Sequence, residues 1–522
     1  MSRLRHLAVL ALLPLLAHCV SAPRLDDVPV SHAVPAAATS SLDRAVLEEL
    51  GPSPQVSGVR LIEQNALAFA YRAATAAAAE RTLDVQYYLW HDDLTGRLLA
   101  AELLRAAERG VRVRVLLDDI HARSRHSIFL IADQHPNVEV RIFNPFYSRY
   151  GALAKMSEWL LRGSRLNRRM HNKAWIADNR VAIVGGRNIG DEYFGASPHS
   201  NFADLDLAMT GPVVDEVSRE FDAYWNDPSA VPVSRFDTRK PKPEELEELI
   251  KSATEYRHEA GETPYIEALR DPQRRAELIA QAPEPLQVRD IRLLVDDPAK
   301  VGRDGEVTAL EASRVLAGLA DTIGHAHEEA LVISPYFVPG EDGTRSLVAR
   351  VQGGVRVAVL TNSLAATDVA AVHSGYARYR RALLKGGVEL YEMKRKAFDE
   401  AGRNRLSLLG SSGASLHTKA IVIDRHWVFV GSMNLDPRSA KLNTEMGVLV
   451  DSGALAAQLR RQFELNIAPE FSYRAALEED NHLVWYDRLD GGDRRTEHEP
   501  DASVWRRIEV SLLRLLPIES QL

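Results

Sequence analysis

Hydrophobic and polar positions predict the same order of elements in two regions of this chain. In the first region, apolar residues recur at helical and then strand spacing, which predicts helices over 67–81 and 98–109 and strands over 83–90, 111–117 and 138–143. In the second region the same patterns predict a helix over 346–351 and strands over 330–337, 355–360 and 388–391. Helices that alternate with strands are typical of an α/β fold, and the repeated order indicates a duplicated domain.

A polar motif closes each region. The first copy reads His171-x-Lys173-x4-Asp178 and continues to Asn188; the second reads His417-x-Lys419-x4-Asp424 and continues to Asn434. In both copies Lys follows His by 2 residues, Asp by 7 and Asn by 17, and the histidines are 246 residues apart (417 − 171). A single His-x-Lys means little, but two copies that agree at four polar positions within matching domains indicate function.

Two such motifs in one active site would supply two imidazoles and two ammonium groups. A neutral imidazole can attack phosphorus in a phosphodiester and form a covalent phosphohistidine, while a protonated imidazole across the phosphate gives a proton to the leaving oxygen. The unperturbed imidazole pKa of about 6.5 suits both roles. The ammonium groups would neutralise the nonbridging oxygens, so we expect neither a metal nor another cofactor.

These residues resemble the signature of the phospholipase D superfamily, H-x-K-x4-D with a trailing G-G/S-x-N, which single-chain members carry twice. The resemblance covers most of the chain beyond residue 59. It implies an α/β fold of two duplicated domains packed about a pseudo-two-fold axis, with the active site at their interface. It also implies that one histidine is the nucleophile and the other the acid; by family habit His171 attacks and His417 donates.

The resemblance also implies roles for the other polar residues of the motifs. Phosphate-binding groups would come from Lys173, Asn188, Lys419, Ser432 and Asn434. A carboxylate downstream of each motif would orient an imidazole; Glu445 fits one position and Asp204 the other, with Asp206 as a nearby competitor. Asp178 and Asp424 complete the catalytic motifs, and we expect them to hold the motif turns by hydrogen bonds more than to take part in the chemistry.

The composition of the chain restricts the kinds of molecule that it is expected to bind. A chain of 522 residues is too long for one ordinary hydrophobic core. Its content of 45% hydrophobic and 26% charged residues is typical of a globular protein. The formal net charge of −8 gives no general basic field, so no nucleic-acid partner is expected. The single cysteine, Cys19, excludes an internal disulfide and a thiolate metal cluster.

Residues 1–19 predict export. Arg3 and Arg5 precede an apolar run that ends at Cys19, and this run resembles a bacterial lipobox, in which the cysteine is lipidated and becomes the mature N-terminus. The alternatives are cleavage by the general signal peptidase after Ala22 and an uncleaved anchor. Each one places the catalytic body outside the cytoplasm, and we expect it in the bacterial cell envelope, associated with a membrane and facing the periplasm.

We divide the rest of the chain into a flexible tether (20–58), a first phospholipase D-like domain (59–234), a charged helical insertion (235–285), a second phospholipase D-like domain (286–475) and a tail (476–522). The insertion is interpreted as solvated surface, with a partner site as the alternative. Residues 504–516 predict an amphipathic helix that either lies on a membrane or docks onto the body. Aromatic residues after the first strand of each region either line the cleft or pack in the core: Tyr87, Tyr88, Trp90, Tyr336 and Phe337.

The export signal, the acidic balance and the amphipathic tail favour a phospholipid substrate at a membrane surface. The layout is similar to that of the cardiolipin synthase C subgroup, whose members join two phospholipids by transphosphatidylation. This implies phosphatidylglycerol as a substrate, with phosphatidylethanolamine as a second candidate. A phospholipase D-type hydrolase of lipids, or less readily of nucleic acid, remains open because only the acceptor differs, alcohol or water. The oligomeric state also remains open.

Overall fold

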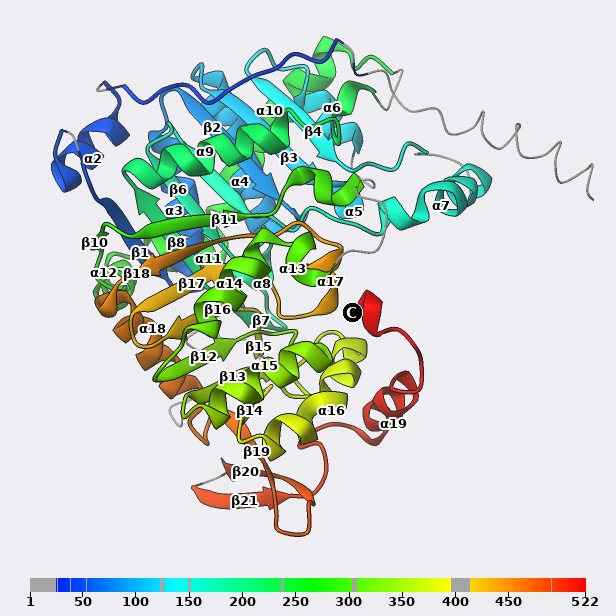
Figure 1. Cartoon of the computed structure of the whole chain (residues 1–522). Coiled ribbons are helices and arrows are strands. Elements are labelled where there is room, and N and C mark those ends of the chain that lie inside the picture. Colours follow the sequence, from blue (N-terminus) through cyan, green and yellow to red (C-terminus); the bar gives the residue numbers. More distant parts are fainter. Residues whose placement is uncertain are drawn as a thin grey trace, which may run out of the picture.

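The computed structural model describes residue 25 and residues 27–37, 39–52, 54–122, 126–148, 152–235, 239–302, 308–395, 414–489 and 491–522. The predicted export segment and Cys19 lie outside these ranges. Two large mixed sheets, one above the other in Figure 1, form two lobes of the same design. The predicted fold class, a duplicated α/β domain, is confirmed.

The sheet of the first lobe has nine strands in the order β10-β1-β8-β6-β5-β2-β3-β4-β9. The central strands β2, β3 and β4 are parallel, and their neighbours on either side are antiparallel. The bounds are β1 Ser57–Ile62, β2 Thr82–Tyr87, β3 Arg112–Asp118, β4 Val138–Phe143, β5 Ala174–Ala177, β6 Val181–Gly185, β8 Asp206–Thr210, β9 Ala230–Pro232 and β10 Leu286–Val288.

The sheet of the second lobe has ten strands in the order β11-β18-β17-β16-β12-β13-β14-β19-β20-β21. Its parallel centre β12-β13-β14 and the antiparallel strand β16 repeat the arrangement of β2-β3-β4 and β5. The bounds are β11 Ile291–Val295, β12 Glu329–Ile333, β13 Arg356–Asn362, β14 Glu389–Met393, β16 Ala420–Ile423, β17 Trp427–Gly431, β18 Met446–Asp451, β19 Ser472–Leu477, β20 Leu483–Leu489 and β21 Gly492–Thr496.

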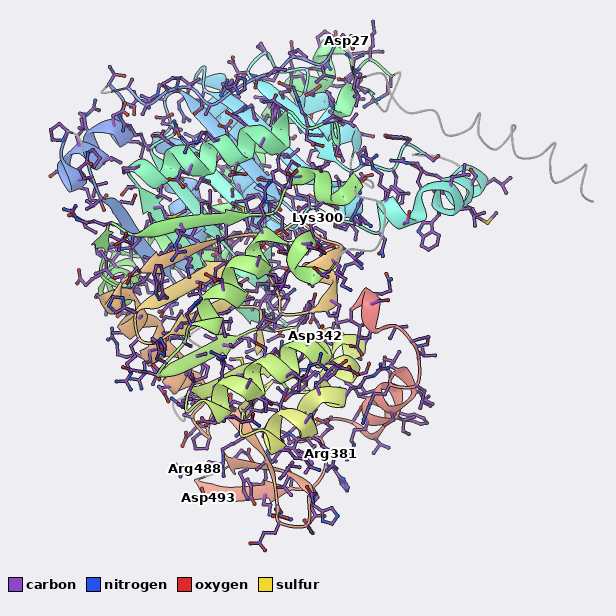
Figure 2. The ribbon with its side chains drawn as sticks, viewed as in Figure 1. Asp27, Lys300, Asp342, Arg381, Arg488 and Asp493 are labelled. Carbon is purple, nitrogen blue, oxygen red and sulfur yellow. The ribbon has the colours of Figure 1, made fainter. Side chains whose placement is uncertain are left out.

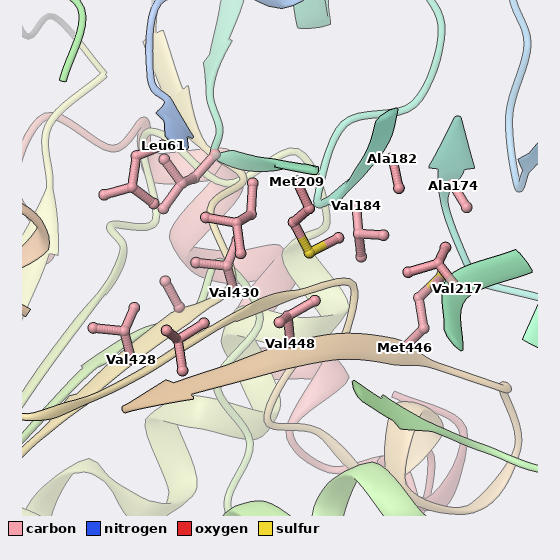
Figure 3. Packing of buried hydrophobic residues seen from close by; sticks show 14 of the residues in the cluster. Leu61, Ala174, Ala182, Val184, Met209, Val217, Val428, Val430, Met446 and Val448 are labelled. Atoms are coloured by element: carbon pink, nitrogen blue, oxygen red, sulfur yellow. The ribbon is translucent and has the colours of Figure 1, made fainter. Parts of the chain in front are cut away.

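One buried hydrophobic cluster joins the two sheets. Figure 3 shows Val184 and Met209 of the first sheet pointing toward Val430 and Val448 of the second. Each of these side chains is at most 1% exposed, and burying one stabilises the fold by roughly 1.5–3 kcal/mol. Helix α9 (Pro212–Trp225) also packs here. The lobes therefore share one core, which fixes their relative position.

Helices cover the outer face of each sheet and close separate cores. On the first sheet these include α3 (Asn65–Ala78), α4 (Leu94–Glu108) and α6 (His126–Ala132); on the second they include α14 (Arg314–Gly324), α15 (Gly340–Gln352) and α16 (Ala370–Lys385). Helix α4 begins after Asp93, whose side chain accepts a hydrogen bond from Gly96 N at 3.0 Å. The helix–strand alternation read from the sequence thus corresponds to helices packed on sheet faces.

The change from the first sheet to the second lies later than the predicted boundary at 286. Strand β10 pairs with β1, so the first sheet ends at Val288 and the second begins at Ile291. The second sheet likewise continues through β19, β20 and β21, beyond the predicted end at 475. These last strands are charged; Arg488 and Asp493, labelled in Figure 2, form an ion pair at 3.3 Å. Trp485 of β20 belongs to the buried core of the second lobe, whereas the edge strand β21 carries no large apolar side chain, so the segment predicted as a tail is part of the second sheet.

Part of the predicted tether is ordered. Helix α2 (Ser41–Leu50) begins with a capping box at Ser40, and Asp43 is fully buried in ion pairs with Arg81 and Arg180 at 2.5 Å.

In the charged insertion, α10 (Pro243–Ala260), α11 (Pro264–Arg270) and α12 (Pro272–Gln281) are helices, as predicted. Helix α10 packs on α4, so this segment covers the first lobe.

The Asp of each motif occupies a tight turn between two strands. Asp178 (φ 54°) and Asp424 (φ 51°) open left-handed turns between β5 and β6 and between β16 and β17. The Asp178 carboxylate accepts hydrogen bonds from the backbone N–H of Glu80, Arg81 and Thr82 at 2.7–3.2 Å, which ties the turn to the start of β2. Asp424 does the same with residues 327–329.

We predict that Asp178→Ala lowers the free energy of unfolding by about 2 kcal/mol, because it leaves buried backbone donors without acceptors. Asp424→Ala is expected to cost less than about 1 kcal/mol, because most of the donors around Asp424 reach water. Urea unfolding of the two variants measures the difference. Equal losses would contradict the assignment of the effect to burial.

Candidate active site

The backbone segments that carry the two histidines cross between the lobes. His171 N donates to Thr444 O of the second lobe at 2.9 Å, and His417 N donates to Ala203 O of the first lobe at 2.8 Å. A small parallel sheet of β7 (Asn201–Ala203) and β15 (Ala414–Leu416) supports the second crossing. Each histidine therefore sits against the segment that precedes the carboxylate of the other lobe.

The carboxylates follow the same crossed pattern. His171 Nδ1 lies 2.9 and 3.0 Å from the two oxygens of Glu445, and His417 Nδ1 lies 2.6 Å from Asp204 Oδ2. The competitor Asp206 instead pairs with Arg72 at 2.9 Å. Because Nδ1 of each imidazole is occupied, Nε2 is the nitrogen left for a substrate.

The two lysines lie beside the imidazoles. Lys173 Nζ donates to His171 O at 2.7 Å, and Lys419 Nζ donates to His417 O at 2.5 Å. Lys419 Nζ is also 3.1 Å from His417 Nδ1, but that nitrogen needs its proton for Asp204, so the hydrogen bond to the carboxylate takes precedence. Both lysines are 1% exposed and both histidines 7%. The site therefore gathers four ionisable basic groups out of water.

Burial sets the charge state of these groups. Loss of solvation lowers the pKa of His171 to about 4, although the Glu445 carboxylate opposes the shift. Burial and then Lys419 lower the pKa of His417. Burial also lowers the pKa of Lys173 to about 7 and that of Lys419 to about 8. An anion such as a phosphodiester would reverse these shifts, because it stabilises every charged form at once.

The carboxylates remain ionised. Burial raises the pKa of Glu445 and of Asp204, but the facing imidazole and a nearby lysine outweigh it, so that the pKa of each carboxyl lies below its usual range. An ionised carboxylate that accepts the Nδ1 proton fixes the imidazole tautomer and leaves a lone pair on Nε2. This is the protonation state that a nucleophilic imidazole needs.

Three residues predicted to bind phosphate differ in their contacts. Asn188 donates to Tyr193 OH at 2.9 Å, whereas Asn434 Oδ1 is buried without a hydrogen-bond partner among the described residues. The Ser432 hydroxyl donates to Glu445 Oε2 at 2.5 Å. Its one proton is therefore used to hold the carboxylate rather than to contact phosphate, a correction to the sequence-based expectation. In the first motif copy Gly186 takes this place, because an added Cβ would lie 2.2 Å from Asp204 Oδ1.

Aromatic rings enclose both imidazoles. Tyr88 packs edge-on against His171 with ring centroids 5.0 Å apart, and Tyr193 and Phe202 contact His417 at 5.2 and 5.0 Å. Tyr87 and Phe337 instead lie in the cores. Tyr193 and Phe202 were missed in the sequence because they belong to no repeated spacing. The rings explain the low exposure of the imidazoles and thus their lowered pKa.

A second polar cluster lies close to the site. In the described part of the chain, His91, Asp93 and Glu192 offer possible metal-ligand atoms within 4.8 Å of one another. His91 Nδ1 is 3.0 Å from Glu192, so an ion pair accounts for the contact. The histidine–lysine site next to it supplies its own positive charge from Lys173 and Lys419. In the part of the chain that the structure describes, none of the helices combines the length and the apolarity that crossing a membrane requires.

Comparisons with known proteins agree with this geometry. The family described as "Cardiolipin synthase, PLD-like domain" matches residues 73–225 and 319–466, one range in each lobe. The chain therefore belongs to this family of the phospholipase D superfamily. It is 42% identical over 480 residues to cardiolipin synthase C of Escherichia coli K12, covering 92% of this chain and 99% of that protein.

Two more distant matches extend over most of the chain. Cardiolipin synthase B of Shigella flexneri is 24% identical over 377 residues, 72% of each chain. The crystal structure of phosphatidylserine synthase from Haemophilus influenzae Rd KW20 matches 92% of this chain and 100% of its own, with a TM-score of 0.56 and 12% identity. At that identity the likeness concerns the fold alone, and it extends over both lobes.

The lowered pKa values predict an acidic optimum. For a soluble phosphodiester with an alkyl leaving group, kcat/KM is expected to rise as pH increases through about 4, where His171 loses its proton and becomes nucleophilic. As the pH increases further, kcat/KM should fall again because His417 loses the proton that it must donate. Since burial lowers the pKa of His417, the midpoint of this alkaline limb should lie below the ordinary imidazole value of 6.5. Initial rates measured from about pH 3 to about pH 9 would include both limbs of the profile.

A good leaving group provides the control. With a nitrophenyl phosphodiester the leaving oxygen needs no proton, so the alkaline limb should move up to about 7, where Lys173 loses its charge. An acidic limb at the ordinary imidazole value in both profiles would contradict the effect of burial on His171.

Proposed function

We propose that this protein is a phosphatidyltransferase that joins two phospholipids in cardiolipin synthesis. The observation that carries the proposal is the crossed anchoring of two imidazoles by Glu445 and Asp204, which leaves Nε2 of each imidazole for a substrate. The extensive identity to a protein named cardiolipin synthase C supports the choice of substrate class.

In the first half of the proposed reaction, His171 Nε2 attacks the phosphorus of a phospholipid. The P–N bond forms while the bond from phosphorus to the headgroup oxygen breaks, and His417 Nε2 gives its proton to that oxygen. Lys173 and Lys419 neutralise the nonbridging oxygens, with Asn188 and Asn434 beside them. The product is a phosphatidyl group bound covalently to His171, together with the free headgroup alcohol.

In the second half, the neutral His417 accepts a proton from the hydroxyl of the acceptor. The acceptor oxygen forms the new bond to phosphorus, the P–N bond breaks, and His171 returns to its starting state. With phosphatidylglycerol as both donor and acceptor, the products are cardiolipin and glycerol. Phosphatidylethanolamine as donor would release ethanolamine by the same chemistry.

Transfer instead of hydrolysis depends on excluding water. Both imidazoles are 7% exposed and are flanked by Tyr88, Tyr193 and Phe202, which favours an alcohol held close over bulk water. Hydrolysis by the same site is the second candidate, because water needs no binding pocket of its own. We further propose that the protein acts in the bacterial cell envelope, exported and attached to a membrane through a lipid on Cys19.

We predict that His417→Ala separates the two steps. With a nitrophenyl phosphodiester the first step needs no acid, so the variant should release about one equivalent of nitrophenolate per protein in a burst and then stall, because no base activates the acceptor. Stopped-flow absorbance measures the burst, and mass spectrometry should find the phosphoryl group on His171. Alkyl phosphodiesters should lose roughly 10²–10⁴-fold in rate.

His171→Ala is the matched control and should give neither burst nor adduct. A burst in His171→Ala and none in His417→Ala would mean that the two histidines exchange roles. Continuous turnover of the nitrophenyl substrate by both variants would contradict a covalent histidine mechanism altogether.

Defined lipids separate transferase from hydrolase. Purified protein incubated with phosphatidylglycerol, with and without phosphatidylethanolamine, is expected to form cardiolipin, because the enclosed site favours the lipid alcohol. Lipid mass spectrometry identifies the product, and His171→Ala is the blank. Phosphatidic acid as the sole product would reject synthesis and leave the hydrolase.

A further inference from the structure

Helix α7 (Ala152–Leu166) faces the wrong way for a helix that packs on a core. Its acidic Glu158 is fully buried, where it accepts hydrogen bonds from Tyr147 N and Ser148 N and pairs with Arg162. Five of its six large apolar side chains are instead 54–75% exposed: Leu153, Met156, Trp159, Leu160 and Leu161. Soluble helices place these residue types in the reverse arrangement. The polar side of α7 fixes it to the protein, and its apolar side remains uncovered.

Helix α19 (Val504–Leu513) and the residues after it repeat this arrangement. Arg506 is held to the body through hydrogen bonds to Leu364 O at 3.0 Å and Thr367 O at 2.5 Å, and Val510 is buried. Leu513 is half-buried, and the other large apolar side chains of this segment are 44–80% exposed: Val504, Trp505, Ile508, Leu512, Leu515 and Leu516. Docking onto the body and an exposed apolar side, which the sequence left as alternatives, therefore occur in the same helix.

The two apolar surfaces lie on one side of the molecule. In Figure 1, α7 and α19 project from the right, above and below the C-terminus. Asn167, just after α7, is hydrogen-bonded to Gln521 near the C-terminus at 2.5 Å, and Arg438 NH2 donates to Asn167 O at 2.7 Å. Of the 18 large apolar side chains that are exposed in the described residues, 11 belong to these two segments. Such clustering marks an interaction surface.

The two segments are linked to residues that lie close to the active site along the chain. Helix α7 ends five residues before His171 (171 − 166), and Arg438 follows Asn434 by four (438 − 434). A surface that docks here brings whatever it binds next to the reacting imidazoles. The proposed substrates carry their phosphate at the surface of a bilayer, so a bilayer fits this position.

The charges beside the apolar residues suit an anionic bilayer. Lys155 and Arg514 are exposed on the two helical segments and Arg507 is half-exposed, against one exposed acidic residue, Glu509. Basic side chains next to apolar ones are typical of helices that lie in the interface of anionic membranes. The chain as a whole carries −8, so this local basic character differs from the average surface.

We propose that α7 and α19 together form a two-part docking surface for an anionic phospholipid bilayer, which holds the active site against the headgroups. The inference rests on the proposed function for the source of its ligand. A second copy of the chain would cover the same apolar residues but would not need the basic ones.

Leu160→Glu and Leu515→Glu test the docking surface in the full chain. Each puts a charge into a side chain that is at least 75% exposed, so folding should be unaffected. Ile279→Glu in α12, at 59% exposure and far from α7 in Figure 1, is the matched control. With phosphatidylglycerol–phosphatidylethanolamine vesicles, we expect each test variant to lose about tenfold in lipid turnover, because burial of its side chain in the interface is lost. Turnover of the soluble nitrophenyl substrate should remain at the wild-type value in all three.

Quenching of tryptophan fluorescence reads docking without any turnover. Vesicles that contain phosphatidylglycerol with brominated acyl chains should quench the wild type, and a Trp159→Phe, Trp505→Phe variant should lose most of that quenching. A lipid on Cys19 would hold every variant on the vesicle, so the signal reports contact of these two side chains and not attachment. Equal quenching of wild type and double variant would overturn the proposal, and so would a dimer that Leu160→Glu dissociates in the absence of lipid. If quenching occurs and no lipid product forms, the docking surface stands and the proposed function fails.

Discussion

The crossed hydrogen bonds between each imidazole and the carboxylate of the opposite lobe are the interaction on which this structure depends. Glu445 holds His171 and Asp204 holds His417, each within 3.0 Å, so neither lobe contains a complete catalytic group. The shared core of Val184, Met209 and their counterparts fixes the lobes closely enough for these contacts. A small change in lobe orientation would misalign both imidazoles at once, because both hydrogen bonds span the same interface between the lobes.

Burial of so many basic groups explains the electrostatics of the site. Two lysines and two histidines disfavour one another's charged forms in a medium that solvates them poorly, and Glu445 and Asp204 offset part of that cost, together with Asp206, Asp368 and Asp436 around the lysines. A phosphodiester restores the balance, since its charge stabilises all four. For the same reason, the proposed reaction needs no positive charge beyond that of these four groups. The aromatic rings of Tyr88, Tyr193 and Phe202 strengthen these effects by excluding water.

Much of the fold was predictable because the apolar periodicity reflects real packing. Strand β4 was predicted with its exact bounds at 138–143, and β2, β3, β13 and β14 lie within a few residues of their predictions. Strands β20 and β21 were not recognised, and the edge strand β21 has no large apolar side chain that could produce a strand pattern. Helix α2 was missed because the ion pairs of Asp43 join residues far apart in sequence. Contacts between residues that are far apart in sequence can stabilise an element without producing an apolar periodicity within it.

The candidate site was predictable residue by residue but not in its connections. Repetition identified the histidines, lysines and asparagines, yet nothing in the spacing indicates that the carboxylates are exchanged between lobes. Ser432 and Gly186 align in the two motifs but meet carboxylates of different length, Glu445 and Asp204. Two identical half-length chains paired by symmetry would have to use the same residues at both positions. Joining the halves in one polypeptide removes that requirement, so each imidazole can acquire its own environment and specialise.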